Sequence, residues 1–155
     1  MIRTVVIGAA GRMGRRLVAN ILESDTLELA GAVEYAESPF LGQDAGAVAG
    51  CGNAGVAITA DLAGALKGAD AVINFATAGV VESTRLAAEN GCKTVDFPSI
   101  STGVYHFPLD RAAKIAISTI IAVTAAHPEI ERVRMVCFDS RTKQAYENAL
   151  REVRG

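Results

Sequence analysis

The sequence predicts a three-layer, doubly wound α/β sandwich with six mainly parallel strands in the order 3-2-1-4-5-6. Two patterns support this fold class. Apolar runs of strand length recur along the 155 residues, and helix-length segments with short turns lie between them. Most apolar runs are continuous, which is typical of strands buried on both faces of a parallel sheet. Right-handed crossovers would place the helices on the faces of the sheet. A chain of 155 residues has the length of one domain, so we expect a single domain spanning residues 1–155.

The strands are expected where the apolar runs lie. Parallel pairing brings all their carboxyl ends to one edge of the sheet, where ligands of doubly wound folds bind. The run at residues 56–59 is the weakest. In chain order, the expected strands are Ile2–Ile7, Leu27–Val33, Val56–Thr59, Ala71–Phe75, Thr94–Phe97 and Val133–Phe138.

Helices are expected where apolar residues recur at helical spacing. The segment Tyr35–Gly55 is rich in Gly and Ala with little periodicity, and we expect a long loop there. The expected helices are Arg12–Glu23, Val80–Asn90, a long helix with Pro108 at its first position and Pro128 after its end, and Arg141–Val153. Their expected inward residues include Met13, Leu17 and Ile21; Thr84 and Ala88; Ala113, Ile117 and Ile120; and Tyr146, Leu150 and Val153. Glu82, Arg85 and Glu89 mark the solvent-facing side of the second helix.

Composition excludes several classes of partner. The net charge is −2, so no basic field is present to hold a nucleic acid or an anionic membrane. No run approaches the roughly 18 apolar residues of a membrane span. Cys51, Cys92 and Cys137 have spacings that fit neither a disulfide framework nor a zinc site. We expect a cytoplasmic protein with reduced thiols and no metal.

A glycine-rich turn follows the first expected strand. Gly8, Gly11 and Gly14 have the spacing that allows a tight turn, close approach of a pyrophosphate and close helix packing. The helix that begins there offers free N–H groups to phosphates. Glu34, twenty residues after Gly14, ends the second strand, where a carboxylate can bind an adenosine ribose. The pattern predicts a Rossmann-like dinucleotide site that favours NAD over NADP; for Arg15 and Arg16 we expect a solvated helix turn.

Residues 1–78 resemble the N-terminal cofactor domain of 4-hydroxy-tetrahydrodipicolinate (dihydrodipicolinate) reductase. The resemblance rests on GAAGRMG, AGAVE and LGQDAG, which occur in the order found in that family. It implies that the pyrophosphate is bound by Gly8, Gly11, Arg12, Met13 and Gly14. It further implies that Glu34 contacts the adenosine ribose and that Phe75 and Thr77 lie on the nicotinamide side.

Residues 79–155 resemble a different family, the C-terminal half of a macrodomain, which binds ADP-ribose. The stretches AAENGCKTVDFPSISTGVYHFPLDRAAKIA and FDSRTKQAYENAL carry this resemblance. It implies a phosphate-binding loop formed by Ser101, Thr102, Gly103, Val104 and Tyr105. Phe138 would then pack on the adenosine ring, although a core or rim aromatic is an equally good interpretation.

Two resemblances in one chain indicate an engineered chimera, with a join between Phe75 and Thr84. Asp96 stands where macrodomains have a small apolar residue, so it would put a charge on a buried strand. His127 is expected to cap a helix, and His106 has no partner placed by sequence to make it a base. We therefore expect no catalytic residues. Three alternatives to dinucleotide binding stay open: an ADP-ribose reader, a surviving nicotinamide-dependent reductase and a scaffold without ligand.

Overall fold

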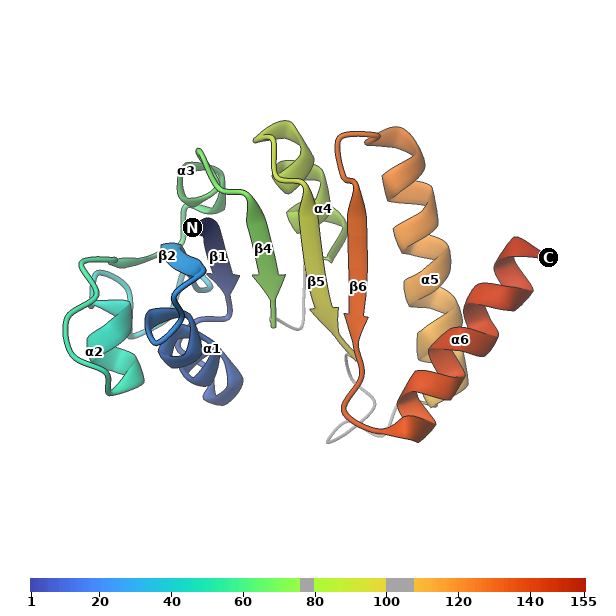
Figure 1. The fold of residues 1–155 in the computed structure, drawn as a ribbon, viewed down its shortest axis with the longest axis horizontal. Helices are drawn as coiled ribbons and strands as arrows, with labels where there is room; N and C mark the ends of the chain where they lie inside the picture. Colours follow the sequence, from blue (N-terminus) through green and yellow to red (C-terminus); the bar gives the residue numbers. More distant parts are fainter. Residues whose placement is uncertain (76–79, 100–107) are drawn as a thin grey trace.

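The computed structural model describes residues 1–75, 80–99 and 108–155, and it contains one six-stranded parallel sheet with the order β3-β2-β1-β4-β5-β6. This confirms the predicted fold class and strand order (Figure 1). No helix in these ranges is long and apolar enough to cross a membrane. The strands are β1 (Ile2–Ile7), β2 (Leu27–Val33), β3 (Ile58–Thr59), β4 (Ala71–Asn74), β5 (Thr94–Pro98) and β6 (Arg132–Val136). The helices are α1 (Arg12–Leu22), α2 (Ala45–Ala49), α3 (Leu62–Ala65), α4 (Val80–Glu89), α5 (Leu109–Ala126) and α6 (Ser140–Arg154).

Strand β1 lies at the centre of the sheet, between β2 and β4. Its last four residues are buried, because their side chains alternate between two apolar layers. Val5 belongs to the layer beneath α3 and α4, whereas Val6 packs with Val18 of α1. The carboxyl end of β1 is thus fixed on both sides, and it is where the glycine-rich turn begins.

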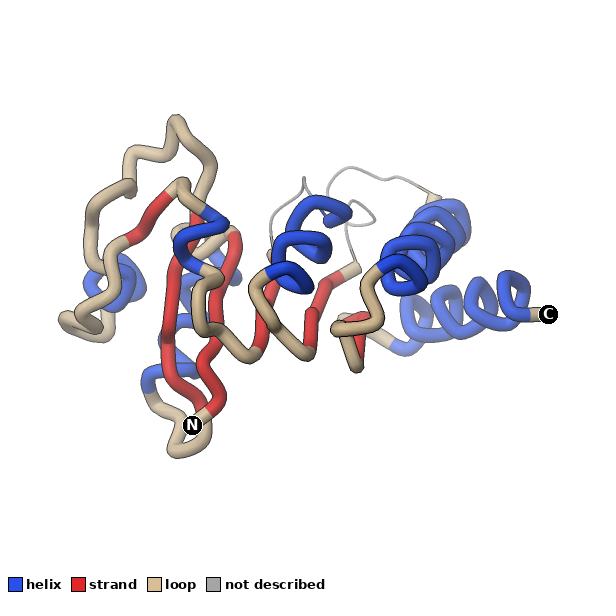
Figure 2. Tube along the Cα trace, turned by 90° about the horizontal axis from the view of Figure 1, so that it is seen from above, coloured by secondary structure: helices blue, strands red, loops and turns tan. Residues whose placement is uncertain are grey.

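One face of β5 and β6 is not covered by a helix of the described chain. Figure 1 shows no helix in front of these strands, and Figure 2 shows α4 and α5 on their other side. Helix α6 packs on α5 instead of on this face. Val95 and Phe97 of β5 are buried under the helices, whereas Val136 of β6 remains 52% exposed. The expectation of burial on both faces is therefore wrong for β6, whose burial alternates along the strand.

Asp96 lies on this uncovered face. The register aligns it with Ile73 of β4 and Arg134 of β6. Arg134 donates from Nε to Oδ1 and from Nη2 to Oδ2, both at 2.7 Å. The carboxylate of Asp96, which was expected to be a buried charge, is thus paired with Arg134 at a solvent-accessible surface. It is accessible because no described helix covers this face of the sheet.

The segment expected to be a loop, residues 35–55, contains helix α2, which corrects the sequence analysis. Asp44 organises it: its carboxylate accepts hydrogen bonds from the N–H groups of Ala47, Ala54 and Val56. These hydrogen bonds, led by that of Ala54, lower the pKa of Asp44. Gly50 ends the helix at φ 80°. The short helix was missed because five residues carry no periodic apolar stripe.

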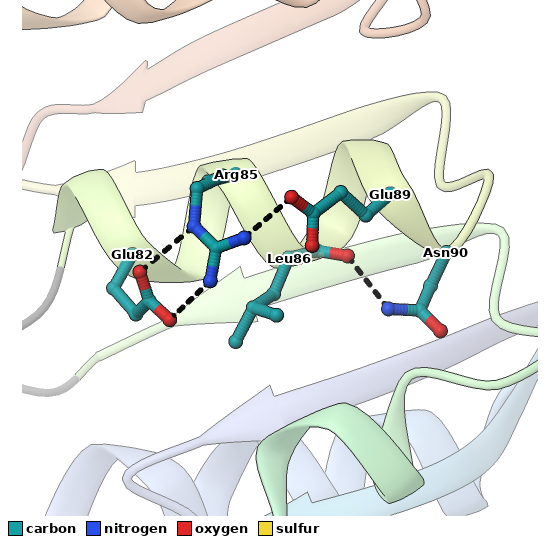
Figure 3. A network of polar contacts seen from close by, with 5 residues as sticks. All are labelled: Glu82, Arg85, Leu86, Glu89 and Asn90. Carbon is teal, nitrogen blue, oxygen red and sulfur yellow. Dashed lines mark hydrogen bonds and ion pairs between the residues drawn. The ribbon is translucent and has the colours of Figure 1, made fainter.

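Helix α4 carries a polar network on its outer side (Figure 3). Arg85 donates to both oxygens of Glu82, at 3.0 and 2.6 Å, and pairs with Glu89 one turn later. Just after the last residue of the helix, the side-chain amide of Asn90 donates to the carbonyl oxygen of Leu86 at 2.9 Å. The predicted solvent-facing side of this helix is confirmed.

The C-terminal helices differ from expectation in detail. Pro108 is the N-cap of α5 rather than its first residue, and His127 is the C-cap, as expected. Tyr146 is buried against α5, but Val153, expected to face inward, is 40% exposed, since the buried residues of α6 run only from Thr142 to Ala149. Met13 is similarly 52% exposed, since it lies in the open first turn of α1.

Candidate functional site

The glycine-rich turn joins β1 to α1 at the carboxyl edge of the sheet. Gly8 has φ 80°, a backbone conformation that residues with a side chain rarely adopt. Its N–H donates to the carbonyl oxygen of Val33 in β2 at 2.8 Å. Gly11 is the N-cap of α1, and no side chain in the described structure caps this helix. The first N–H groups of α1 are therefore available to an external acceptor, at the positive end of the helix dipole.

Gly14 allows α1 to pack directly on the turn. A Cβ at this position would lie 1.9 Å from the carbonyl oxygen of Gly8, so a side chain cannot fit. Gly11 is less constrained, because its Cβ would lie 3.3 Å from the same oxygen and its φ is −67°. The surface above Gly11 is therefore open to a ligand that approaches the N-terminus of α1 from solvent.

Glu34 lies beside this turn. It follows β2, and its own N–H is held by Thr59 at 2.9 Å. Its Oε1 accepts a hydrogen bond from the N–H of Ala10 at 2.8 Å. The structure thus brings together the acid and the turn, 24 residues apart in sequence, as dinucleotide binding requires.

Arg15 contacts Ala10 as well, through the carbonyl oxygen of Ala10, and the sequence did not predict this contact. Its Nε donates to the carbonyl oxygen of Ala10 at 2.8 Å. Its guanidinium lies over the ring of Phe40, 4.9 Å from the centroid. The expectation of a solvated Arg15 is wrong, because Phe40 comes from the folded 35–55 segment, whose structure the sequence did not reveal. Arg12 and Arg16 are exposed.

Phe75 follows β4 and shares the edge with the turn. Its N–H donates to Ile7 of β1 at 2.9 Å, and its side chain is half-buried. The neighbouring Asn74 is fully buried. Thr77 and the whole of the second expected loop, Ser101, Thr102, Gly103, Val104 and Tyr105, lie outside the described residues, as does His106.

Phe138 is 98% exposed at the carboxyl end of β6, so it is not a core aromatic. Asp139, next to it, caps α6 by accepting from the N–H of Thr142 at 2.7 Å, and this hydrogen bond lowers the pKa of Asp139. A groove of about 480 Å³ lies further along, between α5, β6 and α6, with Ile117, Met135 and Leu150 in its wall. Among the described residues, no group of acidic, His and Cys side chains is arranged to hold a metal ion.

A parallel sheet in this order, with an uncapped glycine turn after its first strand and an acid after its second, defines a Rossmann-type fold. The family model described as "Dihydrodipicolinate reductase, N-terminus" matches residues 2–126. The chain belongs to this family. The match extends beyond residue 78, where the resemblance found in the sequence analysis ends.

Curated relatives fall into two groups. A 4-hydroxy-tetrahydrodipicolinate reductase from Syntrophotalea carbinolica is 56% identical over 75 residues, covering 48% of this chain and 28% of the relative. The corresponding reductase from Trichlorobacter lovleyi is 47% identical over 138 residues, covering 89% and 50%. A macro domain-containing protein from Lactiplantibacillus plantarum is 53% identical over 70 residues, covering 44% and 40%. The chain thus resembles both groups, and it spans half or less of the length of each of these relatives.

Solved dehydrogenases share the fold. Amine dehydrogenase from Mycobacterium smegmatis superimposes with a TM-score of 0.52 at 27% identity, covering 76% of this chain and 37% of that one. The WlbA dehydrogenase from Thermus thermophilus, solved in complex with NAD and alpha-ketoglutarate, gives 0.50 at 15% identity, covering 88% and 41%. At that identity the second likeness concerns the fold alone.

Proposed function

We propose that this chain binds an NAD(P)(H) dinucleotide at the turn between β1 and α1. The pyrophosphate lies against the backbone of Gly8, Gly11, Arg12, Met13 and Gly14. Glu34 accepts hydrogen bonds from the adenosine ribose, and Phe75 and Thr77 lie on the nicotinamide side. The observation that carries the proposal is the 2.8 Å contact of Glu34 with Ala10, beside a helix N-terminus that no described side chain caps.

The same contact supports NAD over NADP. A 2′-phosphate on a ribose bound by Glu34 would lie beside the carboxylate, and two neighbouring negative charges repel each other. Arg15 is oriented by Ala10 and Phe40, which leaves only its terminal nitrogens to approach a 2′-phosphate. Arg12 and Arg16 are exposed, so they are the further cations near the turn that could offset this repulsion.

ADP-ribose is the second candidate ligand, bound through the loop Ser101–Tyr105. It is supported by the 53% identity to a macro domain-containing protein over 70 residues. Phe138 supports it as well, because an aromatic ring that is 98% exposed is free to stack on an adenine.

The double resemblance further supports a chimeric origin, with a single domain built from residues 1–78 and 79–155 and no complete catalytic site.

The test is a calorimetric titration of the protein with NAD(H), NADP(H) and ADP-ribose. NAD(H) binding that is lost in Gly11→Val supports the proposed site, since Gly11 has a φ that valine can adopt. Circular dichroism and thermal unfolding of the variant verify that it folds. ADP-ribose binding that survives Gly11→Val but is lost in Gly103→Glu favours the second candidate. No binding of any of these ligands at millimolar concentration leaves a scaffold and rejects both.

Reductase activity is tested separately, by following NADH oxidation with a cyclic imine substrate. The proposal of an incomplete catalytic site expects no oxidation above that of the Gly11→Val protein. Turnover that disappears in Gly11→Val would overturn it and establish a nicotinamide-dependent reductase.

A further inference from the structure

Ala10 is held at both of its backbone polar groups by side chains from different parts of the fold. Its N–H donates to Glu34 at 2.8 Å, and its carbonyl oxygen accepts from Nε of Arg15 at 2.8 Å. The next N–H, that of Gly11, is turned inward to the carbonyl oxygen of Gly8 at 3.2 Å. The peptide between Ala10 and Gly11 is therefore fixed at both of its ends.

The orientation of this peptide matters for an anion. If it rotated, the carbonyl oxygen of Ala10 would leave Arg15 and could turn toward the N-terminus of α1, where its partial negative charge would oppose a phosphate. A glycine such as Gly11, with no Cβ, gives little resistance to such a rotation. Two groups hold this peptide: the carbonyl oxygen of Gly8 at the N–H of Gly11, and Nε of Arg15 at the carbonyl oxygen of Ala10. Arg15 is the side chain of the two.

Phe40 fixes the position of the restraining group. The guanidinium of Arg15 lies 4.9 Å from the ring centroid, within the range of a cation–π contact. Phe40 is itself held in place, because its N–H donates to Ser38, which is 6% exposed, and its ring packs on the apolar layer beneath α1. Arg16, the next residue on the helix, is exposed and carries the same charge.

We propose that Arg15, anchored on Phe40, is a positioning residue that keeps the Ala10–Gly11 peptide in the orientation required for binding a dinucleotide phosphate. This inference rests on the proposed function of the turn. Arg15 acts through Ala10 and need not touch the ligand.

The test compares Arg15→Met with Arg16→Met, which removes the same charge from the same turn of the helix. We expect Arg15→Met to raise the Kd for NAD about tenfold, the loss of one hydrogen bond to a charged group, and Arg16→Met to raise it by less than about threefold. Arg15→Lys restores part of the affinity, because the ammonium can still approach Phe40. Equal increases in Kd for the two methionine variants would overturn the proposal, since they would show that Arg15 contributes only its positive charge, as Arg16 does.

Amide NMR spectra of the ligand-free proteins supply a second readout. The Gly11 amide resonance is expected to shift or broaden in Arg15→Met and in Phe40→Leu, which retains the arginine, and to stay in place in Arg16→Met. If wild type does not bind NAD, the proposed function fails, whereas these spectra still decide whether Arg15 positions the peptide. An unchanged Gly11 resonance in both Arg15→Met and Phe40→Leu would overturn that role.

Discussion

Arg134 on β6 holds Asp96 on β5 through two parallel hydrogen bonds of 2.7 Å each. The side chain of Asp96 is 15% exposed and that of Arg134 is 51% exposed, so the pair lies at the boundary between the sheet and solvent. Its two-point geometry is the form in which an exposed ion pair contributes measurably to stability.

A double-mutant cycle on this pair should show a coupling free energy of about 1 kcal/mol. The variants are Asp96→Ala, Arg134→Ala and their combination, and the measurement is urea unfolding. The coupling should decrease in high salt, because the half-exposed charge of Arg134 is screened. Exposed Arg132, two residues earlier on the same face, is the control and should show no coupling with Asp96. A coupling free energy of zero between Asp96 and Arg134 would contradict a stabilising role for this ion pair.

Replacing Gly14 by Ala should destabilise the fold by about 2–3 kcal/mol, because the new Cβ would lie 1.9 Å from a backbone oxygen and the helix must move away from the turn. Gly11→Ala is the matched control. Its Cβ meets the same oxygen at 3.3 Å, and we expect a cost under about 1 kcal/mol. Urea unfolding of both proteins measures the difference; equal costs would show that α1 does not depend on close packing at Gly14.

Asp44 should make stability depend on pH at the acid end. Its folded-state pKa is lowered by backbone N–H groups, that of Ala54 first. The stabilisation is therefore present above the ordinary aspartate pKa of about 3.9 and is lost as the pH falls through the lower folded value. The midpoint temperature of thermal unfolding should therefore fall less steeply between about pH 5 and pH 2 in Asp44→Asn than in wild type. Exposed Asp25→Asn is the control, and a slope unchanged by Asp44→Asn would refute the prediction.

Two of the free thiols, those of Cys51 and Cys92, should differ in reactivity. Cys51 is exposed, whereas burial, with a smaller contribution from Asp70, raises the pKa of Cys92 to about 11. In a disulfide-exchange assay near neutral pH, Cys51 should react first and Cys92 only on unfolding. Because the unfolded thiol ionises at a lower pH than the folded one, Cys92 should also make stability decline as the pH rises above about 9 toward 11. Rapid labelling of Cys92 in the folded Cys51→Ser protein would contradict this.

Local pattern was sufficient for the elements that are long or strongly apolar. The bounds of β1 and β2 match the expected runs residue for residue, and those of α1 differ by one residue. These segments are specified by their own composition: buried strands need continuous apolar residues, and Gly11 and the apolar stripe of α1 define a helix start. The turn and Glu34 were found for the same reason, since their spacing is fixed by the strand–helix–strand unit.

Contacts between distant segments were not predictable from local pattern. Arg15 reaches Phe40 across 25 positions, and Asp96 reaches Arg134 across 38 positions, in a register that only the assembled sheet defines. A signal for the second pair existed: Arg132 and Arg134 alternate with Val133 and Met135, a period of two that predicts one wet face. The apolar content of the run obscured this alternation.

The uncovered face of β5 and β6 has a consequence for how this sequence can change. Neighbouring positions on these strands meet opposite selection: Val95 and Phe97 face the helices, whereas Asp96 and Arg134 face water. Substitutions between polar residues should be tolerated more readily at every second position than at the intervening positions, which stay apolar. In a library of variants, β5 and β6 should thus tolerate substitutions at alternate positions, whereas the last four residues of the central strand β1, which are all buried, should tolerate few substitutions at any position.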